Sequence, residues 1–219
     1  MIKLSKRLSM IASMVKQCNS VADIGSDHAY IPCALVLNNQ CAFAVAGDIA
    51  QGPLEQAKAN IAKYDLIGKV KPVLSNGLEA IEAVDTIIIA GMGVVTAIEI
   101  MDAQLDKIKQ AKQVIVQVNK DPFTLRHWIN DHHFTIDDEA CVYEDHDYVA
   151  ISFNAATKSV YTDQQCYLGP ILQTLKDKNV QTYYDHLMQN NRYLLDKVVD
   201  PIKKSTIQTH IDWLNQLHK

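Results

Sequence analysis

The sequence predicts an α/β fold, a Rossmann-like doubly wound sheet followed by a C-terminal α-helical hairpin, and three observations carry this prediction. First, several expected strands are apolar along their whole length, as in DTIIIAG (85–91), which is typical of a sheet covered on both faces. Second, such strands alternate with helical patterns through short loops, as in doubly wound α/β proteins. Third, after Ala156 the strand patterns stop and apolar residues recur only at helical spacing.

The elements of the sheet domain follow one another along the chain. A first amphipathic helix is expected from about Ser5 to Gln17, with Ser5 as its N-cap. Five strand-helix units are then expected, with strands at 21–25, 42–49, 69–75, 85–91 and 113–118 and helices at 29–38, 53–64, 77–83, 94–109 and 122–131. Two more strands, at 134–144 and 148–155, are expected to pair antiparallel across a DHD turn. A single sequence leaves the order of the strands across the sheet open.

The C-terminal segment is expected to form a helical hairpin. Gly169 and Pro170 interrupt the chain, and Pro201 then separates two stretches whose apolar residues recur at helical spacing. These apolar stripes are explained by the two helices packing on each other, so they carry little information about function. We therefore expect two domains, residues 1–156 and residues 157–219.

Composition limits the class of protein. Of the 219 residues, 48% are hydrophobic and 21% are charged, so a packed core is expected and disorder is not. The N-terminal stretch does not resemble a secretory signal, and no stretch approaches the roughly 20 apolar residues of a membrane span. The five cysteines form no CxxC pair and have no metal-ligand spacing. We therefore expect a cytoplasmic protein with reduced thiols, no metal and no membrane contact, and a monomer is favoured although the oligomeric state stays open.

The net charge of −4 is unevenly distributed along the chain. Residues 1–154 hold 13 Lys and Arg against 19 Asp and Glu, whereas residues 155–219 hold 8 against 6, so the tail alone is net positive. A polyanionic partner would therefore meet the tail or a local basic patch rather than the body. Ordinary scatter of surface charge accounts for the same numbers equally well.

Candidate functional residues gather at the ends of expected strands, where ligands bind in open parallel sheets. The first strand ends in DIGSDH, in which Gly25 permits a tight turn. Amides at the start of the following helix attract a negative group such as a carboxylate. The dinucleotide pattern GxGxxG is absent, which argues against a pyrophosphate cradle, and the Walker-type GxxxxGK[ST] is absent as well.

Three further strand ends carry suitable residues. Asp48 lies 23 residues after Gly25 and can accept both hydroxyls of a ribose; alternatively, it caps the next helix. The Asn-Gly pair at 76–77 can place a small polar side chain against an adenine edge, or it is only a turn. The AGMG segment at 90–93 allows close approach of a ligand to the backbone, or it is an ordinary loop.

Together these features describe an adenosine cofactor without phosphates, S-adenosylmethionine. A carboxylate for the ribose, a contact for adenine and a glycine turn without a pyrophosphate loop fit its nucleoside half. Helix-terminal amides suit the carboxylate of its methionine half, and Asp23 suits the ammonium group. The expected cofactor contacts are Asp23, Gly25, Ser26, His28, Asp48, Ile49, Asn76, Gly77, Ala90, Gly91, Met92 and Gly93.

Five segments resemble a known family. LSKRL (4–8), ADIGSDHAYIP (22–32), AGDIAQGP (46–53), NGL (76–78) and IAGMG (89–93) together resemble the bacterial tRNA (adenine-22-N1)-methyltransferase family. The resemblance covers about residues 3–155 by motif and the tail by architecture, since the family carries a C-terminal helical hairpin. It implies a class I methyltransferase domain, S-adenosylmethionine as the methyl donor, and methylation of the N1 nitrogen of an adenine in the D-arm region of tRNA.

Three positions depart from the pattern of that family. Asp48 stands where the family usually has glutamate, and Val94 follows Gly93 where the family has a further glycine. Val118 replaces the proline that precedes the residue matching Asn119. We expect the first two changes to be tolerated by cofactor binding, and the third to affect the geometry around Asn119.

Four residues are candidates for catalysis, because methylation of an adenine N1 requires alignment and a group that tolerates positive charge on the base. Asp27 is the first candidate for that role, unless it only caps a helix. His28 is expected to contact the cofactor or to assist proton removal from the exocyclic amine, unless it is a structural histidine. Tyr30 is expected to stack on the target base or the cofactor, unless it is core, and Asn119 to bond the base edge, unless it only ends a strand.

Basic residues near the first helix and in the tail are candidates for tRNA binding, although such residues more often form a solvated face. They are Lys3, Lys6, Arg7, Arg192, Lys197, Lys203 and Lys204. Two other functions stay open: a small-molecule methyltransferase with the tail as a lid or dimer contact, and a non-catalytic adenosine-binding protein. A salt-dependent interaction with tRNA would separate the first from a tRNA enzyme. Cofactor binding without methyl transfer would favour the second.

Overall fold

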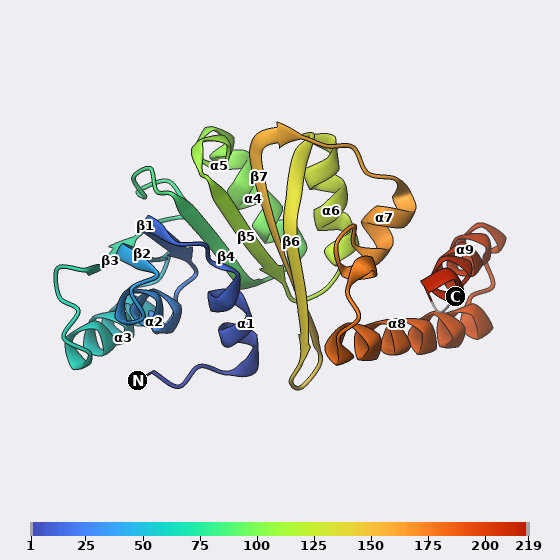
Figure 1. Cartoon of the computed structure of the whole chain (residues 1–219), viewed down its shortest axis with the longest axis horizontal. Coiled ribbons are helices and arrows are strands. Elements are labelled where there is room, and N and C mark those ends of the chain that lie inside the picture. The colour runs from blue at the N-terminus through green and yellow to red at the C-terminus, as the bar shows by residue number, and fades with distance from the viewer. Residues whose placement is uncertain (1, 218–219) are drawn as a thin grey trace.

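The structure is a computed structural model that describes residues 2–217. Within these residues the chain forms a seven-stranded sheet between two layers of helices, with a helical extension after the last strand (Figure 1). The strands are β1 (Cys18–Ile24), β2 (Cys41–Asp48), β3 (Val70–Leu74), β4 (Thr86–Met92), β5 (Gln113–Val118), β6 (Phe134–Tyr143) and β7 (Asp147–Lys158). The helices are α1 (Lys6–Met14), α2 (Tyr30–Leu37), α3 (Gln51–Lys63), α4 (Val94–Ala103), α5 (Leu105–Gln110), α6 (Pro122–Asp131), α7 (Asp163–Leu168), α8 (Lys178–Lys197) and α9 (Pro201–Leu217), with a 3₁₀ turn η1 (Leu172–Thr174).

The strands lie in the order β3-β2-β1-β4-β5-β7-β6, and β7 is antiparallel to both of its neighbours. Strands β1 to β5 are parallel, so their carboxyl ends share one edge of the sheet, on the lower side in Figure 1. The chain reverses its direction across the sheet between β1 and β4, which leaves a crevice at that edge. The predicted doubly wound sheet with C-terminal helices is therefore confirmed, and its strand order puts the ends of β1 and β4 side by side.

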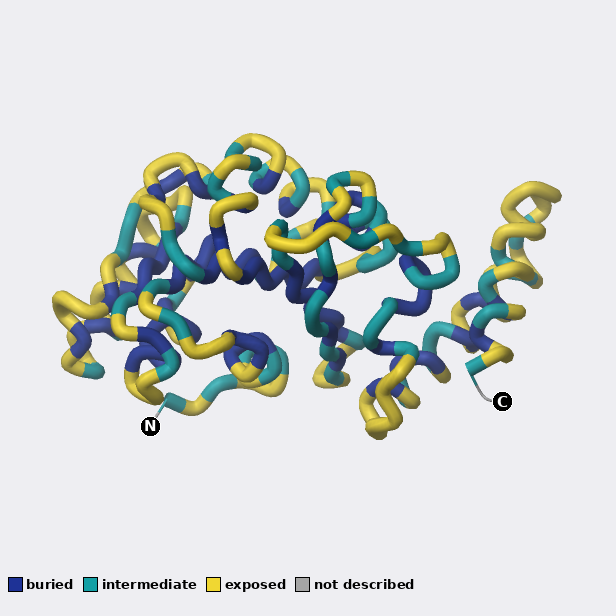
Figure 2. Tube along the Cα trace, turned by 45° about the horizontal axis from the view of Figure 1, so that its top comes forward, coloured by how far each residue is buried: buried dark blue, intermediate teal, exposed yellow. Residues whose placement is uncertain are grey.

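Successive residues of the central strands enter two separate cores. Val21 and Ile88 pack with residues of α1, α2 and α3, whereas Ala22 and Ile89 pack with residues of α4, α5 and α6. This alternation is the period of two that places neighbouring strand side chains on opposite faces. Figure 2 shows the buried backbone concentrated along the middle of the sheet, which explains why the central strands are apolar throughout.

The helix expected at 77–83 is wrong. Residues 77–80 form a turn, and residues 81–84 have no regular structure. Lys107 Nζ donates to the carbonyl oxygens of Leu78 (2.7 Å), Glu79 (3.1 Å) and Ile81 (2.7 Å). In a helix these carbonyl oxygens would accept from backbone amides four residues later. A lysine from α5 takes that role here, so the segment satisfies its carbonyls without a helix.

Two further helix predictions differ in detail. The helix expected at 94–109 is split into α4 and α5 at Gln104, whose backbone leaves the helical region with φ −134°. The first helix is shorter than expected, but Ser5 is its N-cap, and its Oγ accepts a hydrogen bond from the amide of Leu8 (3.3 Å). A capping hydroxyl of this kind fixes the first turn of α1.

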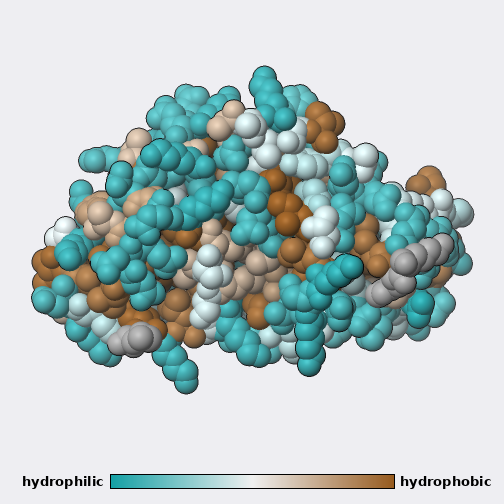
Figure 3. Space-filling view, in the orientation of Figure 1, coloured by the Kyte–Doolittle hydropathy of each residue, from teal (hydrophilic) through white to brown (hydrophobic). Residues whose placement is uncertain are grey.

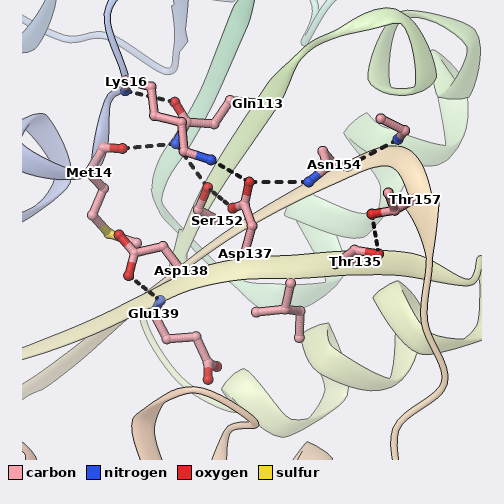
Figure 4. Close-up of polar contacts among 12 residues, drawn as sticks. Met14, Lys16, Gln113, Thr135, Asp137, Asp138, Glu139, Ser152, Asn154 and Thr157 are labelled. Atoms are coloured by element: carbon pink, nitrogen blue, oxygen red, sulfur yellow. Dashed lines mark hydrogen bonds and ion pairs between the residues drawn. The ribbon is translucent and has the colours of Figure 1, made fainter.

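The end of α1 is anchored to the sheet by a polar network at the edge opposite the crevice (Figure 4). Gln113 Nε2 donates to Met14 O (2.8 Å) and to Ser152 Oγ (3.0 Å), and Gln113 Oε1 accepts from Lys16 N (3.0 Å). Lys16 Nζ pairs with Asp137 at 2.6 Å. Gln113 is buried, so its removal would leave polar partners unsatisfied. The network holds α1 across β5 and thereby determines where the first turn of α1 lies.

The C-terminal helices pack on the sheet domain rather than standing apart from it. Strand β7 continues to Lys158, just past the expected boundary, and α9 folds back to contact both α8 and α7 (Figure 1). Phe153 of β7 belongs to the same hydrophobic cluster as Leu168 of α7 and Leu214 of α9. None of the helices within residues 2–217 combines the length and the apolar character that crossing a membrane requires.

Candidate functional site

A cavity of about 470 Å³ opens at the carboxyl ends of β1, β2 and β4. Its volume lies in the range of small-molecule sites. Six residues that the sequence analysis selected line it: Gly25, Asp48, Ile49, Asn76, Gly77 and Met92. Its far wall comes from α4, through Thr96, Glu99 and Ile100, which the sequence analysis did not select. They look like ordinary helix residues in the sequence, so no local signal could have identified them.

Asp48 ends β2 at the rim of this cavity. Its Oδ1 accepts a hydrogen bond from the amide of Ala50 (2.8 Å), and within the described residues its other oxygen has no hydrogen-bond partner. The N-cap of α3 is Ala50, which has no side-chain cap, so Asp48 is not the capping residue of that helix. A half-exposed carboxylate with a free oxygen can accept hydroxyl hydrogen bonds. Ile49 beside it is 70% exposed and offers the cavity an apolar surface.

Gly25 makes the turn that follows β1. Its φ is +77°, in the left-handed region that glycine adopts without steric cost. Its amide donates to Gly47 O (2.8 Å), which ties the turn to the neighbouring strand. A Cβ at Gly25 would meet Cε of Met92, the end of a side chain that can move aside, so the positive φ rather than this contact favours glycine here.

The end of β4 is shaped by a bulge and a buried glutamine. The register with β5 shifts between Ala90 and Met92, and Gly91 has φ +77°. The amide of Gly91 donates to Oε1 of Gln117 (3.2 Å), which also accepts from Nη1 of Arg7 (2.9 Å). Gln117 was not among the predicted site residues, although a glutamine between the valines of QVIVQV was an available signal. Gln117 therefore joins the glycine loop to α1.

Asp23 is a buried carboxylate beside the turn. Its side chain is 6% exposed, and its Oδ2 accepts from Ser26 Oγ (2.6 Å). Within the described part of the chain its other oxygen has no hydrogen-bond partner. Burial raises the pKa of Asp23 to about 7, against the opposing effects of the Ser26 hydroxyl and the Arg7 charge. A cation that binds beside this acid would stabilise its ionised form.

The segment after Gly25 presents three of the candidate catalytic side chains. Asp27 Oδ2 lies 3.2 Å from His28 Nε2. The rings of His28 and Tyr30 are stacked, with 5.2 Å between their centres. The N-cap of α2 is Ala29, with a left-handed backbone and no side-chain cap, so Asp27 does not cap this helix. Tyr30 is 37% exposed and therefore is not a core residue.

A second cavity of about 230 Å³ lies on the other side of Gly25. It is lined by Arg7, Asp23, Gly25, Ser26, Asp27, His28, Tyr30 and Ala90, with three apolar neighbours. Gly25 lines both cavities, so a ligand long enough to occupy both would pass over its Cα. The two cavities together bring most of the predicted cofactor and catalytic residues to one place.

Three other candidates lie beside these cavities without lining them. Gly91 and Gly93 shape the loop after β4, where Gly93 is the N-cap of α4. Asn119 is exposed at the end of β5, and its Nδ2 donates to Gly91 O (2.9 Å). Asn119 is thus bonded to the glycine loop.

The basic candidates fall into two groups. Lys3 and Lys6 are exposed near the first turn of α1, where the amide of Lys6 donates to Glu144 Oε1 (3.1 Å) in the β6–β7 turn. Arg7 belongs to the second cavity instead. The tail residues are all exposed on α8 and α9, at the far right in Figure 1, and comprise Arg192, Lys197, Lys203 and Lys204.

A further hollow of about 510 Å³ lies beside the edge strand β3. It is lined mainly by apolar residues such as Phe43, Ile61 and Ile67, and Figure 3 shows hydrophobic side chains at the lower left, over this end of the molecule. It contains no carboxylate, so it lacks the groups that the crevice offers to a ribose or an ammonium. The described residues also contain no group of three or more His, Cys, Asp or Glu side chains arranged to hold a metal ion.

Known proteins are similar to this chain in both sequence and fold. Residues 4–151 match the family described as "Methyltransferase domain". The tRNA (adenine(22)-N(1))-methyltransferase of Bacillus subtilis is 38% identical over 146 residues, which make up 66% of this chain and 61% of that protein. This sequence match therefore spans less than two thirds of the Bacillus protein.

Two solved structures extend the similarity to the whole chain. The crystal structure of the B. subtilis M1A22 tRNA methyltransferase TrmK superposes with a TM-score of 0.87 at 27% identity and full coverage of both chains. TrmK of M. capricolum, in complex with the cofactor product S-adenosyl-homocysteine, has a TM-score of 0.83 and 32% identity, and covers 97% of this chain and 96% of its own. The crevice, the glycine loops and the C-terminal helices thus occur in a chain that belongs to the methyltransferase-domain family and, within it, to the tRNA (adenine(22)-N(1))-methyltransferase family.

Proposed function

We propose that this protein transfers the methyl group of S-adenosylmethionine to the N1 nitrogen of an adenine in the D-arm region of tRNA, at position 22. The observation that carries the proposal is the pair of cavities that meet at Gly25. One has a carboxylate, Asp48, on its rim, and the other holds the acid Asp23 and the cation Arg7. A nucleoside that carries an amino-acid end has complementary groups at the same two places.

The residues present fit the parts of this cofactor. Asp48 would accept the ribose hydroxyls, while Ile49 and the turn at 76–77 would flank the adenine. Asp23 would pair with the ammonium of the methionine half. Gly25 lines both cavities and has no side chain, so the ligand would lie against its backbone. When bound, S-adenosylmethionine supplies a methyl group activated by a sulfonium.

The chain's own side chains would then act on the target base. Methylation at N1 leaves the adenine positively charged, and the exposed carboxylate of Asp27 is placed to stabilise that charge. The Asp27–His28 pair is also placed to receive the proton that the cationic base gives up from its exocyclic amine. Asn119 keeps its Oδ1 available to accept from that amine, because its Nδ2 is engaged by Gly91.

Access to the base depends on the tRNA surface. An adenine inside a folded tRNA must leave its stack before a side chain such as Tyr30 can contact it. The exposed cations Lys3 and Lys6 lie at or just before the start of α1, whose Arg7 lines the second cavity, and those of α8 and α9 lie farther along the molecule. Both groups are suited to phosphate contacts. A tRNA substrate implies that the protein works in the cytoplasm.

The test is methyl transfer to an unmodified tRNA transcript with adenine at position 22, using labelled S-adenosylmethionine and nucleoside analysis. We expect 1-methyladenosine in the product. The matched substrate control is the same transcript with guanine at that position, which should take up no label. The matched protein control is Asp27→Asn, which should lower the transfer rate by roughly 100-fold while cofactor affinity changes little.

Two outcomes would overturn the proposal. Label that accumulates only in small metabolites would favour a small-molecule methyltransferase. Cofactor binding without transfer to any transcript would favour a non-catalytic adenosine-binding protein.

A further inference from the structure

We propose that Arg7 is a cofactor ligand, whose guanidinium binds the α-carboxylate of the methionine half of S-adenosylmethionine. This assignment rests on the proposed function, because it takes that cofactor as the occupant of the crevice. It replaces the expectation that Arg7, like Lys3 and Lys6, meets tRNA. It also makes α1 a part of the cofactor site.

The first argument is the distribution of charge in the two cavities. Among the described residues that line them, Arg7 is the only lysine or arginine. The cavity on the Asp48 side contributes acidic groups alone, namely Asp48, Glu79 and Glu99. A carboxylate brought into this crevice therefore meets one permanent cation. The planar guanidinium is well suited to it, because it can donate two parallel hydrogen bonds to a carboxylate.

The second argument is that Arg7 is held in place before any ligand arrives. Its Nη1 donates to Gln117 Oε1 (2.9 Å), and its guanidinium lies 5.4 Å from the ring centre of Tyr148. A Cβ at Gly91 would lie 3.0 Å from Nη1, so the side chain packs against the glycine loop. The amide of Arg7 donates to Glu144 Oε2 (3.3 Å). An arginine that binds RNA from the protein surface would not need to be held by a glutamine, an aromatic ring and the glycine loop.

The third argument is that the donors of Arg7 are only partly used. Within residues 2–217, its Nε and Nη2 have no hydrogen-bond partner, and no ion pair joins Arg7 to Asp23 or to another acid. Asp23 likewise keeps one oxygen without a partner. The same cavity thus holds an acid and a cation that, within the described residues, form no direct ion pair with each other. An amino-acid zwitterion, with its ammonium toward Asp23 and its carboxylate toward Arg7, satisfies both.

The glycine loop links this contact to the rest of the site. Gln117 bonds both the Arg7 guanidinium and the amide of Gly91, so the position of Arg7 and the shape of the loop after β4 are set by one buried side chain. The same loop carries Ala90, which lines the second cavity with Arg7. The methionine carboxylate would therefore bind to a guanidinium whose position is already fixed relative to the β4 loop.

The experiment compares three ligands that differ only in the methionine half, measured by titration calorimetry without tRNA. S-adenosylmethionine has both the carboxylate and the ammonium, decarboxylated S-adenosylmethionine keeps only the ammonium, and 5′-methylthioadenosine has neither. For Arg7→Gln we expect S-adenosylmethionine to bind roughly 10- to 100-fold more weakly. The affinities for the other two ligands should change by less than about threefold, which also shows that the variant is folded.

Two further variants sharpen the comparison. Arg7→Lys keeps the charge but loses the planar fork, so it should recover part of the affinity for S-adenosylmethionine. Lys109→Gln removes an exposed cation from α5, outside both cavities, and should leave all three affinities within about twofold of the wild type. This control separates a contact with the carboxylate from a general change in charge.

Several results would overturn the assignment. Equal losses for all three ligands in Arg7→Gln would give Arg7 a structural role. Unchanged affinity for S-adenosylmethionine together with weaker tRNA binding would return Arg7 to the RNA surface. Either result leaves the proposed methyltransferase function intact, whereas a wild-type protein that binds none of the ligands would remove both proposals together.

Discussion

Two buried carboxylates, Asp23 at the crevice and Glu139 under the C-terminal helices, are built in opposite ways. Glu139 accepts from Arg126 Nε (2.6 Å) with one oxygen and from the amides of Ile171 (2.8 Å) and Leu172 (3.0 Å) with the other. Within residues 2–217, the Asp23 side chain accepts only from the Ser26 hydroxyl. Both acids are almost inaccessible to solvent, so burial alone does not separate them.

The difference lies in how far the protein itself satisfies each charge. Arg126 comes from α6 and also donates to the carbonyls of Cys166 (3.2 Å) and Tyr167 (3.4 Å), so the ion pair fastens α7 and η1 to the sheet domain. Within the described residues, one nitrogen, Arg126 Nη2, has no partner. Glu139 is thus a structural anchor. Asp23 keeps an unused oxygen beside a cavity, which is how a protein holds a charge in readiness for a ligand.

Breaking the anchor should have the largest effect on stability. Replacing Arg126 with methionine leaves the Glu139 carboxylate buried without its counter-ion, and we expect the free energy of unfolding to fall by about 3 to 5 kcal/mol. Urea titration followed by circular dichroism measures it. The matched control is the double variant Arg126→Met/Glu139→Leu, which removes both charges and should lose less. A single variant within about 1 kcal/mol of the wild type would show that Glu139 is not an anchor.

Removing the charge at Asp23 should instead change how stability and binding depend on pH. The folded-state pKa, about 7, lies above the ordinary value of 3.8. The folded protein therefore holds a proton that the unfolded chain releases, and the free energy of unfolding falls as pH rises from about 4 to 7. Asp23→Asn should abolish this fall and gain stability over the wild type above pH 7, on the order of 4 kcal/mol. Urea titrations at a series of pH values measure it.

The same substitution tests the ligand side of the comparison. Only the ionised acid pairs with an ammonium, so the wild-type affinity for S-adenosylmethionine should rise with pH up to about 7 and then level off. Asp23→Asn should bind more weakly and lose that rise. Ser26→Ala is the matched control, since it removes the one hydrogen bond to Asp23 while keeping the acid. A pH-independent wild-type affinity would contradict the role given to Asp23.

Asp48 should behave as a ligand-binding residue with little structural weight. Asp48→Asn can still accept from the amide of Ala50, so we expect stability within about 0.5 kcal/mol of the wild type. Loss of the charged acceptor should weaken the binding of S-adenosylmethionine about tenfold. 5′-methylthioadenosine has the same ribose, so its binding should weaken equally. Arg7→Gln, in contrast, is expected to leave the binding of 5′-methylthioadenosine nearly unchanged. Calorimetry measures both affinities. If Asp48→Asn binds both ligands as tightly as the wild type does, Asp48 does not bind the ribose.

The tail cations should give the smallest effect. Lys203→Gln/Lys204→Gln should weaken tRNA binding a few-fold and reduce the slope of log affinity against log salt by up to about 2. S-adenosylmethionine affinity should not change, because α9 does not line either cavity. Filter binding at several salt concentrations measures the slope. An unchanged slope would show that these two lysines do not contact phosphates.

The type of fold and most of the residues that line the crevice could be predicted from the amino-acid sequence. The positions of strands and helices follow from the spacing of apolar residues along the chain. For β5 and α6, the predicted ranges therefore agree with those in the structure. The glycine turn at Gly25 and the acid at Asp48 were also readable, because each follows a strand at the edge where parallel strands bind ligands.

The distant residues that complete the site could not be predicted, because they meet only in the folded chain. Arg7 and Gln117 are 110 positions apart, and their hydrogen bond depends on α1 lying across β5. The failed helix at 77–83 has the same origin, because its carbonyls are taken by a lysine from α5. A buried glutamine, a lysine and an arginine look like ordinary polar residues in a sequence, since their partners are set by the strand order and by the packing of helices on the sheet. Local patterns record what a residue's neighbours in the chain favour, whereas charge pairing in the crevice depends on which elements the fold brings together.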